Sequence, residues 1–281
     1  MGNYYCLMTE VPVVAMEGGN SGISYAEFRE QCDKELTASD KKLLAYSYLK
    51  TDCRNLVKLL RNADADLDLE GNYTKDQLVD LITQATDPEV TKVKDYPAFM
   101  VDFIRQSYLP NEDKTGYFAD DAVMLAYYQY AMQCKNEMLA EWFSLNFNLT
   151  NILTALIARQ NGWKVADYVL GENEISETIK TSKAKDFDLG RDYDFVAELI
   201  KIVDTDDPVE KEKRIDAFKW LWLDDKTFFD GFGVEAVFAY LCKLEMLNRW
   251  EMLDPEKGKE TFTQIIENLR SEAKVPAEFV R

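Results

Sequence analysis

Apolar side chains recur at helical spacing along most of this chain. One stripe, spaced four, three and four residues apart, consists of Leu49, Cys53, Leu56 and Leu60. A second ridge, inside a stretch from Gly233 to Leu253, consists of Val234, Val237, Leu241 and Leu244. Both sets fall on one face of an α-helix. Because hardly any segment alternates apolar and polar residues with a period of two, the pattern predicts an all-α chain.

Short polar sequences mark where these helices begin. Ser24 with Glu27, and Thr74 with Gln77, have the spacing of a capping box. A further start signal at Thr37 precedes the first long apolar stripe, and an acidic connection follows that stripe. The opening segment, 4–8, is short and apolar, and its pattern fits a buried strand as well as a helix.

The remainder of the chain also has the pattern of helices. From 120 to about 162 it predicts one very long helix, with a possible break near Asn146. Shorter helices are predicted between Gly171 and Gly190 and around Leu199. The last predicted helices are 209–223, 233–253 and a closing helix from Thr261.

Composition and charge restrict the partners and the location of the protein. The 281 residues are 47% hydrophobic and carry a net charge of −18. An acidic surface repels phosphate backbones and anionic headgroups, so we expect no nucleic acid and no direct membrane surface as partner. The five cysteines are widely spaced and include no C-x-x-C pair. No signal peptide is visible, and no apolar run reaches about 18 residues. These features predict a cytoplasmic protein.

The chain has no histidine, and this excludes much enzyme chemistry. Histidine is the usual general base near neutral pH and the commonest transition-metal ligand. The acidic run from Asp64 to Glu70 resembles the start of a calcium loop, but Gln77 stands where a bidentate glutamate is needed. Neither G-x-x-x-x-G-K-[ST] nor G-x-G-x-x-G occurs, and Gly258-Lys259 lacks the residues around it that a phosphate loop requires. We therefore expect no catalytic site, no metal and no cofactor.

One carboxylate cluster leaves an enzymatic alternative open. It consists of Asp224, Asp225 and Asp230, with Lys226 beside them. Paired carboxylates perform acid–base chemistry when their environments differ, and such a site would have to converge in a pocket. Helix capping and solvation are the interpretation that we favour for these residues.

An asparagine inside a strongly helical segment recurs three times. These residues, Asn55, Asn148 and Asn248, stand 93 and 100 residues apart and divide the chain into near-thirds. An acid precedes the first and the third by three residues, at Asp52 and Glu245, whereas the second has a leucine there. Asparagine is a poor helix former, so its recurrence predicts a structural hydrogen bond.

These segments resemble the C-subunit family of V-type and A-type ATP synthases, whose eukaryotic relative is the d-type protein of the V-ATPase. The family pattern is an acid, then Asn-Leu or Asn-Ile, then an apolar pair, in three helical modules. It is read here as Asp52-x-x-Asn55-Leu56, as Asn148-Leu149 and as Glu245-x-x-Asn248-Arg249. The opening Tyr4-Tyr5-x-Leu7-Met8 resembles a bacterial branch of small acidic proteins associated with these enzymes.

The resemblance implies a fold and a function. The fold would be a funnel-like body of three helical modules, at about 1–110, 111–205 and 206–281. The function would be that of a non-catalytic central-stalk protein that joins the shaft subunits to the proteolipid ring of the membrane rotor. Such a protein is cytoplasmic and peripheral to the inner membrane, which it contacts only through partner subunits. The alternative is an α-helical interaction adaptor unrelated to ATP synthases, with a linear solenoid or a simple bundle as its architecture.

Overall fold

The computed structural model describes residues 2–16, 22–108 and 119–252. Every regular element in these ranges is a helix, which confirms the all-α prediction. The elements are α1 (Tyr5–Glu10), α2 (Tyr25–Glu35), α3 (Ala38–Arg61), α4 (Lys75–Thr86), α5 (Ala98–Tyr108), α6 (Ala119–Ala131), α7 (Glu137–Gln160), the 3-10 helix η1 (Val165–Asp167), α8 (Glu174–Thr181), α9 (Val196–Val203), α10 (Pro208–Thr227) and α11 (Val234–Met252). The predicted closing helix from Thr261 lies outside the described residues. None of the helices in the described ranges is both long and apolar enough to cross a membrane.

The helices belong to two compact units. The first contains Leu36–Phe228, and the second contains Asn3–Glu35 and the described residues from Phe229 onward. Helices α3 to α10 therefore form one unit, and α1, α2 and α11 form the other. The predicted module boundaries near 110 and 205 stay a prediction.

The predicted helix starts are confirmed where side chains cap the backbone. Thr74 Oγ1 accepts the Gln77 N–H and the Gln77 side chain accepts the Thr74 N–H, which completes a capping box. Ser24 and Glu27 exchange the same pair of hydrogen bonds. The predicted long helix from 120 is interrupted, but not near Asn146. The interruption lies between α6 and α7, because Asn136 Oδ1 caps α7 at the Leu139 N–H.

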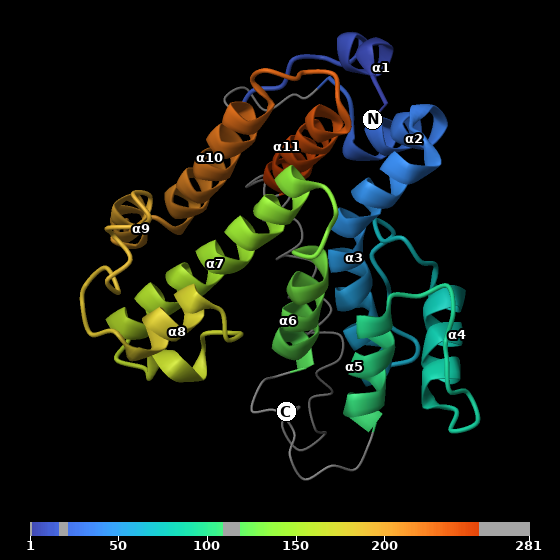
Figure 1. Ribbon diagram of the computed structural model, residues 1–281, viewed down its shortest axis with the longest axis horizontal. Coiled ribbons are helices and arrows are strands. Elements are labelled where there is room, and N and C mark those ends of the chain that lie inside the picture. Colours follow the sequence, from blue (N-terminus) through green and yellow to red (C-terminus); the bar gives the residue numbers. More distant parts are fainter. Residues whose placement is uncertain (1, 17–21, 109–118, 253–281) are drawn as a thin grey trace, which may run out of the picture. The chain divides into compact units, whose positions relative to one another are not determined.

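In the first half of the larger unit, α3, α4, α5 and α6 pack together (Figure 1). Helix α6 contacts α3 and α5, and α4 contacts α5. Aromatic side chains join α3 to α6, where Tyr46 and Tyr130 stack at 5.3 Å and the Tyr127 hydroxyl donates to the Tyr46 carbonyl. Fully buried side chains of this half include Leu44, Leu56, Leu78, Leu81, Met100 and Ile104.

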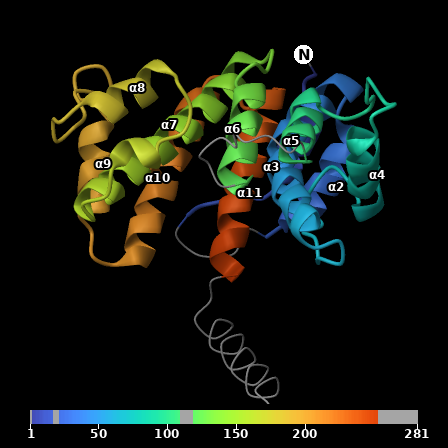
Figure 2. The ribbon, with the colours of Figure 1, turned by 90° about the horizontal axis from the view of Figure 1, so that it is seen from below.

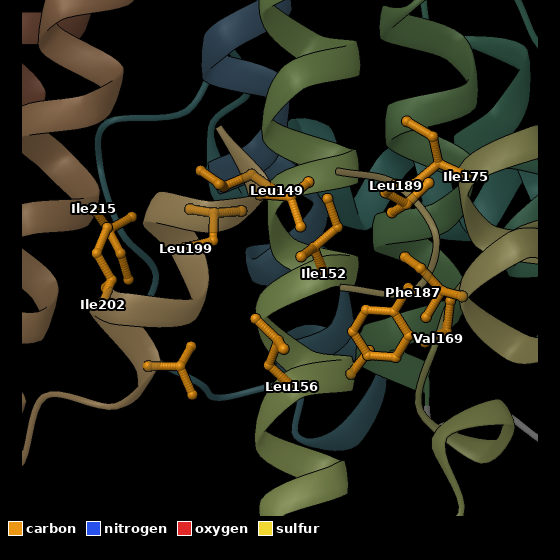
Figure 3. Close-up of a cluster of buried hydrophobic side chains, with 14 residues drawn as sticks. Leu149, Ile152, Leu156, Val169, Ile175, Phe187, Leu189, Leu199, Ile202 and Ile215 are labelled. Carbon is orange, nitrogen blue, oxygen red and sulfur yellow. The ribbon is translucent and has the colours of Figure 1, made fainter. Parts of the chain in front are cut away.

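The second half of the larger unit surrounds α7. Helices α8 and α9 contact α7, and α10 contacts α9 (Figure 2). Figure 3 shows Ile152 and Leu156 of α7 between Phe187 on one side and Leu199 on the other. Each half therefore contains one helix of 24 residues, and shorter helices pack against it: α6 against α3, and α8 and α9 against α7.

The smaller unit contains the opening segment, which is helical and not a strand. The Tyr4 N–H donates to the Phe232 carbonyl at 2.7 Å, just before α11 begins. The Tyr240 hydroxyl donates to the Pro12 carbonyl, and the Tyr240 ring lies 4.7 Å from that of Phe28 on α2. These contacts hold the first residues of the chain on α11.

Candidate functional site

Asn55, a predicted repeat residue, is fully buried in α3 and binds the connection that follows this helix. Its Nδ2 donates to the carbonyl of Asp68 at 2.7 Å, and its Oδ1 accepts the N–H of the same residue at 3.0 Å. The side-chain amide thus pairs with both backbone polar groups of one residue. Because the buried amide of Asn55 needs partners, this pair fixes the course of the connection. We call this arrangement an amide clamp.

Asp52, one turn earlier on α3, binds the same connection nearer to its end. Its carboxylate accepts the N–H groups of Asn72 and Tyr73 and the side-chain amide of Asn72. Asp52 is fully buried, so these donors replace water around its charge. Burial, together with the Asp52 charge, raises the pKa of Tyr73 to about 12. Asp52 and Asn55 together bring the chain to Thr74, where α4 begins.

A second amide clamp lies on α7, and its asparagine is Asn151. Its Nδ2 donates to the Leu170 carbonyl at 2.9 Å, and its Oδ1 accepts the Leu170 N–H at 3.0 Å. Asn151 is buried, and its amide also donates to the hydroxyl of the buried Ser176 in the first turn of α8. The geometry at Leu170 repeats that at Asp68.

Asn148, the predicted repeat residue of this helix, has the position of Asp52 and not that of Asn55. It lies three residues before the clamping asparagine, and its Oδ1 accepts from Asn173, the N-cap of α8. The predicted register is therefore wrong by three residues in the second copy. In the corrected register, Asp52 corresponds to Asn148 and Asn55 to Asn151, and both pairs stand 96 residues apart.

The third predicted pair lies on α11. Glu245 is exposed and Asn248 is half-buried, three residues apart as in the other two copies. The interval from Asn151 to Asn248 is 97 residues, close to the 96 residues between Asn55 and Asn151. The segment after α11 lies outside the described residues.

Gly71 marks how tightly the first connection packs on Asp52. A Cβ added at Gly71 would lie 2.3 Å from Asp52 Oδ1, an oxygen held by backbone donors. We expect Gly71→Ala to lower the free energy of unfolding by about 2 kcal/mol, because the carboxylate must leave its donors. Urea unfolding followed by circular dichroism measures the change. Gly231→Ala, where nothing lies within 4 Å, is the matched control, and equal stability of the two variants would contradict this packing.

Three other sequence motifs were candidate sites. Within the described ranges, which include the acidic run from Asp64, no three His, Cys, Asp or Glu side chains are placed to hold a metal ion. Asp224 and Asp225 are exposed near the end of α10. Lys226 forms an ion pair with Glu141, and Asp230 accepts the N–H groups of Phe232 and Gly233. Gly258-Lys259 lies outside the described residues.

The arrangement on α3 and α7 consists of hydrogen bonds within the chain. Its polar groups face backbone N–H and C=O groups, and they hold two connections of equal length, 62–74 and 161–173, in fixed conformations. Sequence analysis missed Asn151, although this residue also stands mid-helix. The three-residue spacing of Asp52 and Asn55, applied to Asn148, would have found it.

Comparison with known proteins places the chain in a family. A family model described as "Protein of unknown function (DUF2764)" matches residues 1–273. The chain belongs to the DUF2764 family. No curated protein and no solved structure matches it. Membership of the DUF2764 family covers nearly the whole chain, including both amide clamps and the Glu245 and Asn248 pair.

Proposed function

We propose that the protein is a non-catalytic coupling component of a V-type or A-type rotary ATP synthase. It would join the central shaft to the proteolipid ring of the membrane rotor. Three helical modules would form its body, and its partners would connect it to the membrane. The resemblance to the C-subunit family of these enzymes is the starting point for this proposal.

The observation that carries the proposal is the amide clamp that recurs after 96 residues. In the corrected register the second copy reads Asn148-x-x-Asn151-Ile152, beside Asp52-x-x-Asn55-Leu56 in the first. Asn followed by Leu or Ile, as in the family pattern, occurs in both registers. The corrected register changes the acid position of the second copy, where the polar Asn148 stands in place of a leucine. The third pair on α11 continues the period.

The physical properties of the clamps suit a part that transmits force. Each clamp ties a long helix to the connection that follows it through hydrogen bonds of a buried asparagine, and such bonds are stronger in a medium of low dielectric constant. A coupling component must pass torque without bending, and it needs no reactive group. Rigid junctions repeated along the chain meet that requirement.

A helical interaction adaptor is the second candidate, and one observation favours it. Leu69, Trp163 and Tyr168 are exposed in the two clamped connections, as expected of a surface that binds proteins. This candidate shares the absence of catalysis and differs in its partners. Identification of the partners therefore decides between the two.

Affinity purification of the full-length tagged chain from detergent-solubilised membranes of the source cells tests the proposal. We expect the catalytic, shaft and proteolipid subunits to co-purify in fixed ratios, as determined by mass spectrometry. Deletion of the gene should leave ATP hydrolysis by the detached catalytic head while ion pumping is lost. A tagged acidic protein of similar size and charge is the control.

Two results would contradict the proposal. One is recovery of the chain without any rotary subunit under conditions in which the intact ATP synthase survives. The other is full coupling of hydrolysis to pumping in membranes that lack the protein.

A further inference from the structure

The clamped connections display apolar side chains to solvent in both halves of the larger unit. In 62–74 the side chain of Leu69 is 94% exposed, next to the clamped residue Asp68. In 161–173 Trp163 is 51% and Tyr168 44% exposed, and their rings stack at 5.4 Å. Single exposed apolar residues are common and need no explanation. Here they recur in the same connection of two repeated halves.

The backbone beneath these side chains is fixed. Asp68 is clamped by Asn55, and the Glu70 N–H donates to Asp68 Oδ1, so both neighbours of Leu69 are held. Trp163 follows Gly162, which has φ of +70°, and its N–H donates to the Ala158 carbonyl at 2.8 Å. This is a Schellman ending of α7, which determines where the indole emerges. A backbone that is already fixed loses little conformational entropy on binding.

A hollow lies beside Leu69, on the same connection. It has a volume of about 360 Å³ and is lined by 65–75 apart from Glu70, including Leu67 and Tyr73. Leu69 can therefore insert into a partner, and the hollow beside it can receive a side chain of that partner. Such two-way fit suits the surface of a folded protein.

Charge indicates the chemistry of the partner. Residues 62–74 include four carboxylates and no basic residue. Residues 161–173 include two carboxylates and Lys164, which forms an ion pair with Asp167 at 2.9 Å. The first connection therefore has a net charge of −4 around Leu69, and the second has a net charge of −1. Complementary charge would be supplied by lysines and arginines.

We propose that connections 62–74 and 161–173 are docking surfaces for a protein that presents apolar side chains among lysines and arginines. Leu69 and the Trp163–Tyr168 pair are the apolar anchors, and the carboxylates around Leu69 select a basic partner. This inference goes beyond the proposed function, because it assigns the binding surfaces and holds for a rotary subunit or for another partner.

Photo-cross-linking in the source cells tests the proposal. The full chain carries p-benzoylphenylalanine at position 69, 163 or 221 in separate strains. Leu221 on α10 is 68% exposed but lies outside both connections, so it is the matched control. We expect positions 69 and 163 to yield cross-links to a protein and position 221 to yield none. Any of three results would overturn the proposal. They are cross-linked products from all three positions, cross-links to lipid or nucleic acid, and the absence of a product from positions 69 and 163.

Binding of the purified cross-linked protein to the full chain then measures each anchor. We expect Leu69→Ser and Trp163→Ser each to weaken binding about tenfold, and Leu221→Ser to leave it unchanged. A double variant with Asp64→Asn and Asp66→Asn should weaken binding. The double variant with Asp192→Asn and Asp194→Asn removes the same charge elsewhere, and it should weaken binding less. This difference should shrink in about 0.5 M salt. Equal effects of anchor and control variants would overturn the proposal.

The identity of the product separates this proposal from the proposed function. A rotary subunit supports both. A basic protein unrelated to ATP synthases that meets the binding criteria supports the docking surfaces and contradicts the coupling function. A second copy of this acidic chain as the product overturns the docking proposal. Rotary subunits could also co-purify as strongly with Leu69→Ser and Trp163→Ser as with the wild-type chain. That result supports the proposed function and overturns the docking surfaces.

Discussion

Asn151→Leu is expected to lower the free energy of unfolding by about 3 kcal/mol. Leucine matches the size of asparagine but cannot accept the Leu170 N–H, and the Ser176 hydroxyl loses its donor as well. The Leu170 carbonyl loses one of its two donors and keeps the Ser176 hydroxyl. Each buried polar group left without a partner costs about 1–3 kcal/mol. Urea unfolding followed by circular dichroism measures the loss, and faster amide exchange at Leu170 locates it.

Asn148→Leu is the matched control for the register. Asn148 is half-buried, and its Oδ1 accepts from the Asn173 side chain, which still caps α8 through its own oxygen. We expect this variant to cost about 1 kcal/mol, the value of one ordinary hydrogen bond. If Asn148→Leu proved more damaging than Asn151→Leu, the corrected register would be wrong.

Asp52→Ala has the largest expected effect, about 4 kcal/mol. The substitution removes the acceptor of three donors at once, the N–H groups of Asn72 and Tyr73 and the Asn72 side-chain amide. It also leaves a cavity beneath Gly71, where the carboxylate now packs. Thermal and urea unfolding measure the loss, with Asp64→Ala in the same connection as the exposed control.

Asp52→Asn distinguishes the hydrogen bonds from the packing. Asparagine has the shape of aspartate, but one of its two polar groups is an NH₂ donor. In this site that NH₂ group would face N–H donors of the connection and could not bond to them. We expect a loss of about 2 kcal/mol, between wild type and Asp52→Ala. Asp52→Asn with wild-type stability would mean that Asp52 acts through its volume and not as an acceptor.

Local sequence chemistry predicted much of the fold. Apolar spacing indicated the long helices, since a stripe with a period of 3.6 residues buries only as a helix. The Thr74–Gln77 capping box was predicted because both hydrogen bonds join residues within one turn. The break in the second long helix was misplaced, since both Asn136 and Asn146 fit a cap. The structure shows that Asn136 caps α7, whereas the Asn146 side chain donates to the Trp142 carbonyl inside the helix.

By itself, the sequence determined that the chain is helical, acidic and without histidine chemistry, and that an asparagine recurs in its long helices. These properties depend on composition and on neighbours within a few residues. Only the tertiary structure decided that Asn151 is the counterpart of Asn55. The partners of these amides, Leu170 and Asp68, stand 19 and 13 residues downstream. Which asparagine reaches the backbone is therefore fixed by how the connection folds back on the helix and not by residues near it in sequence.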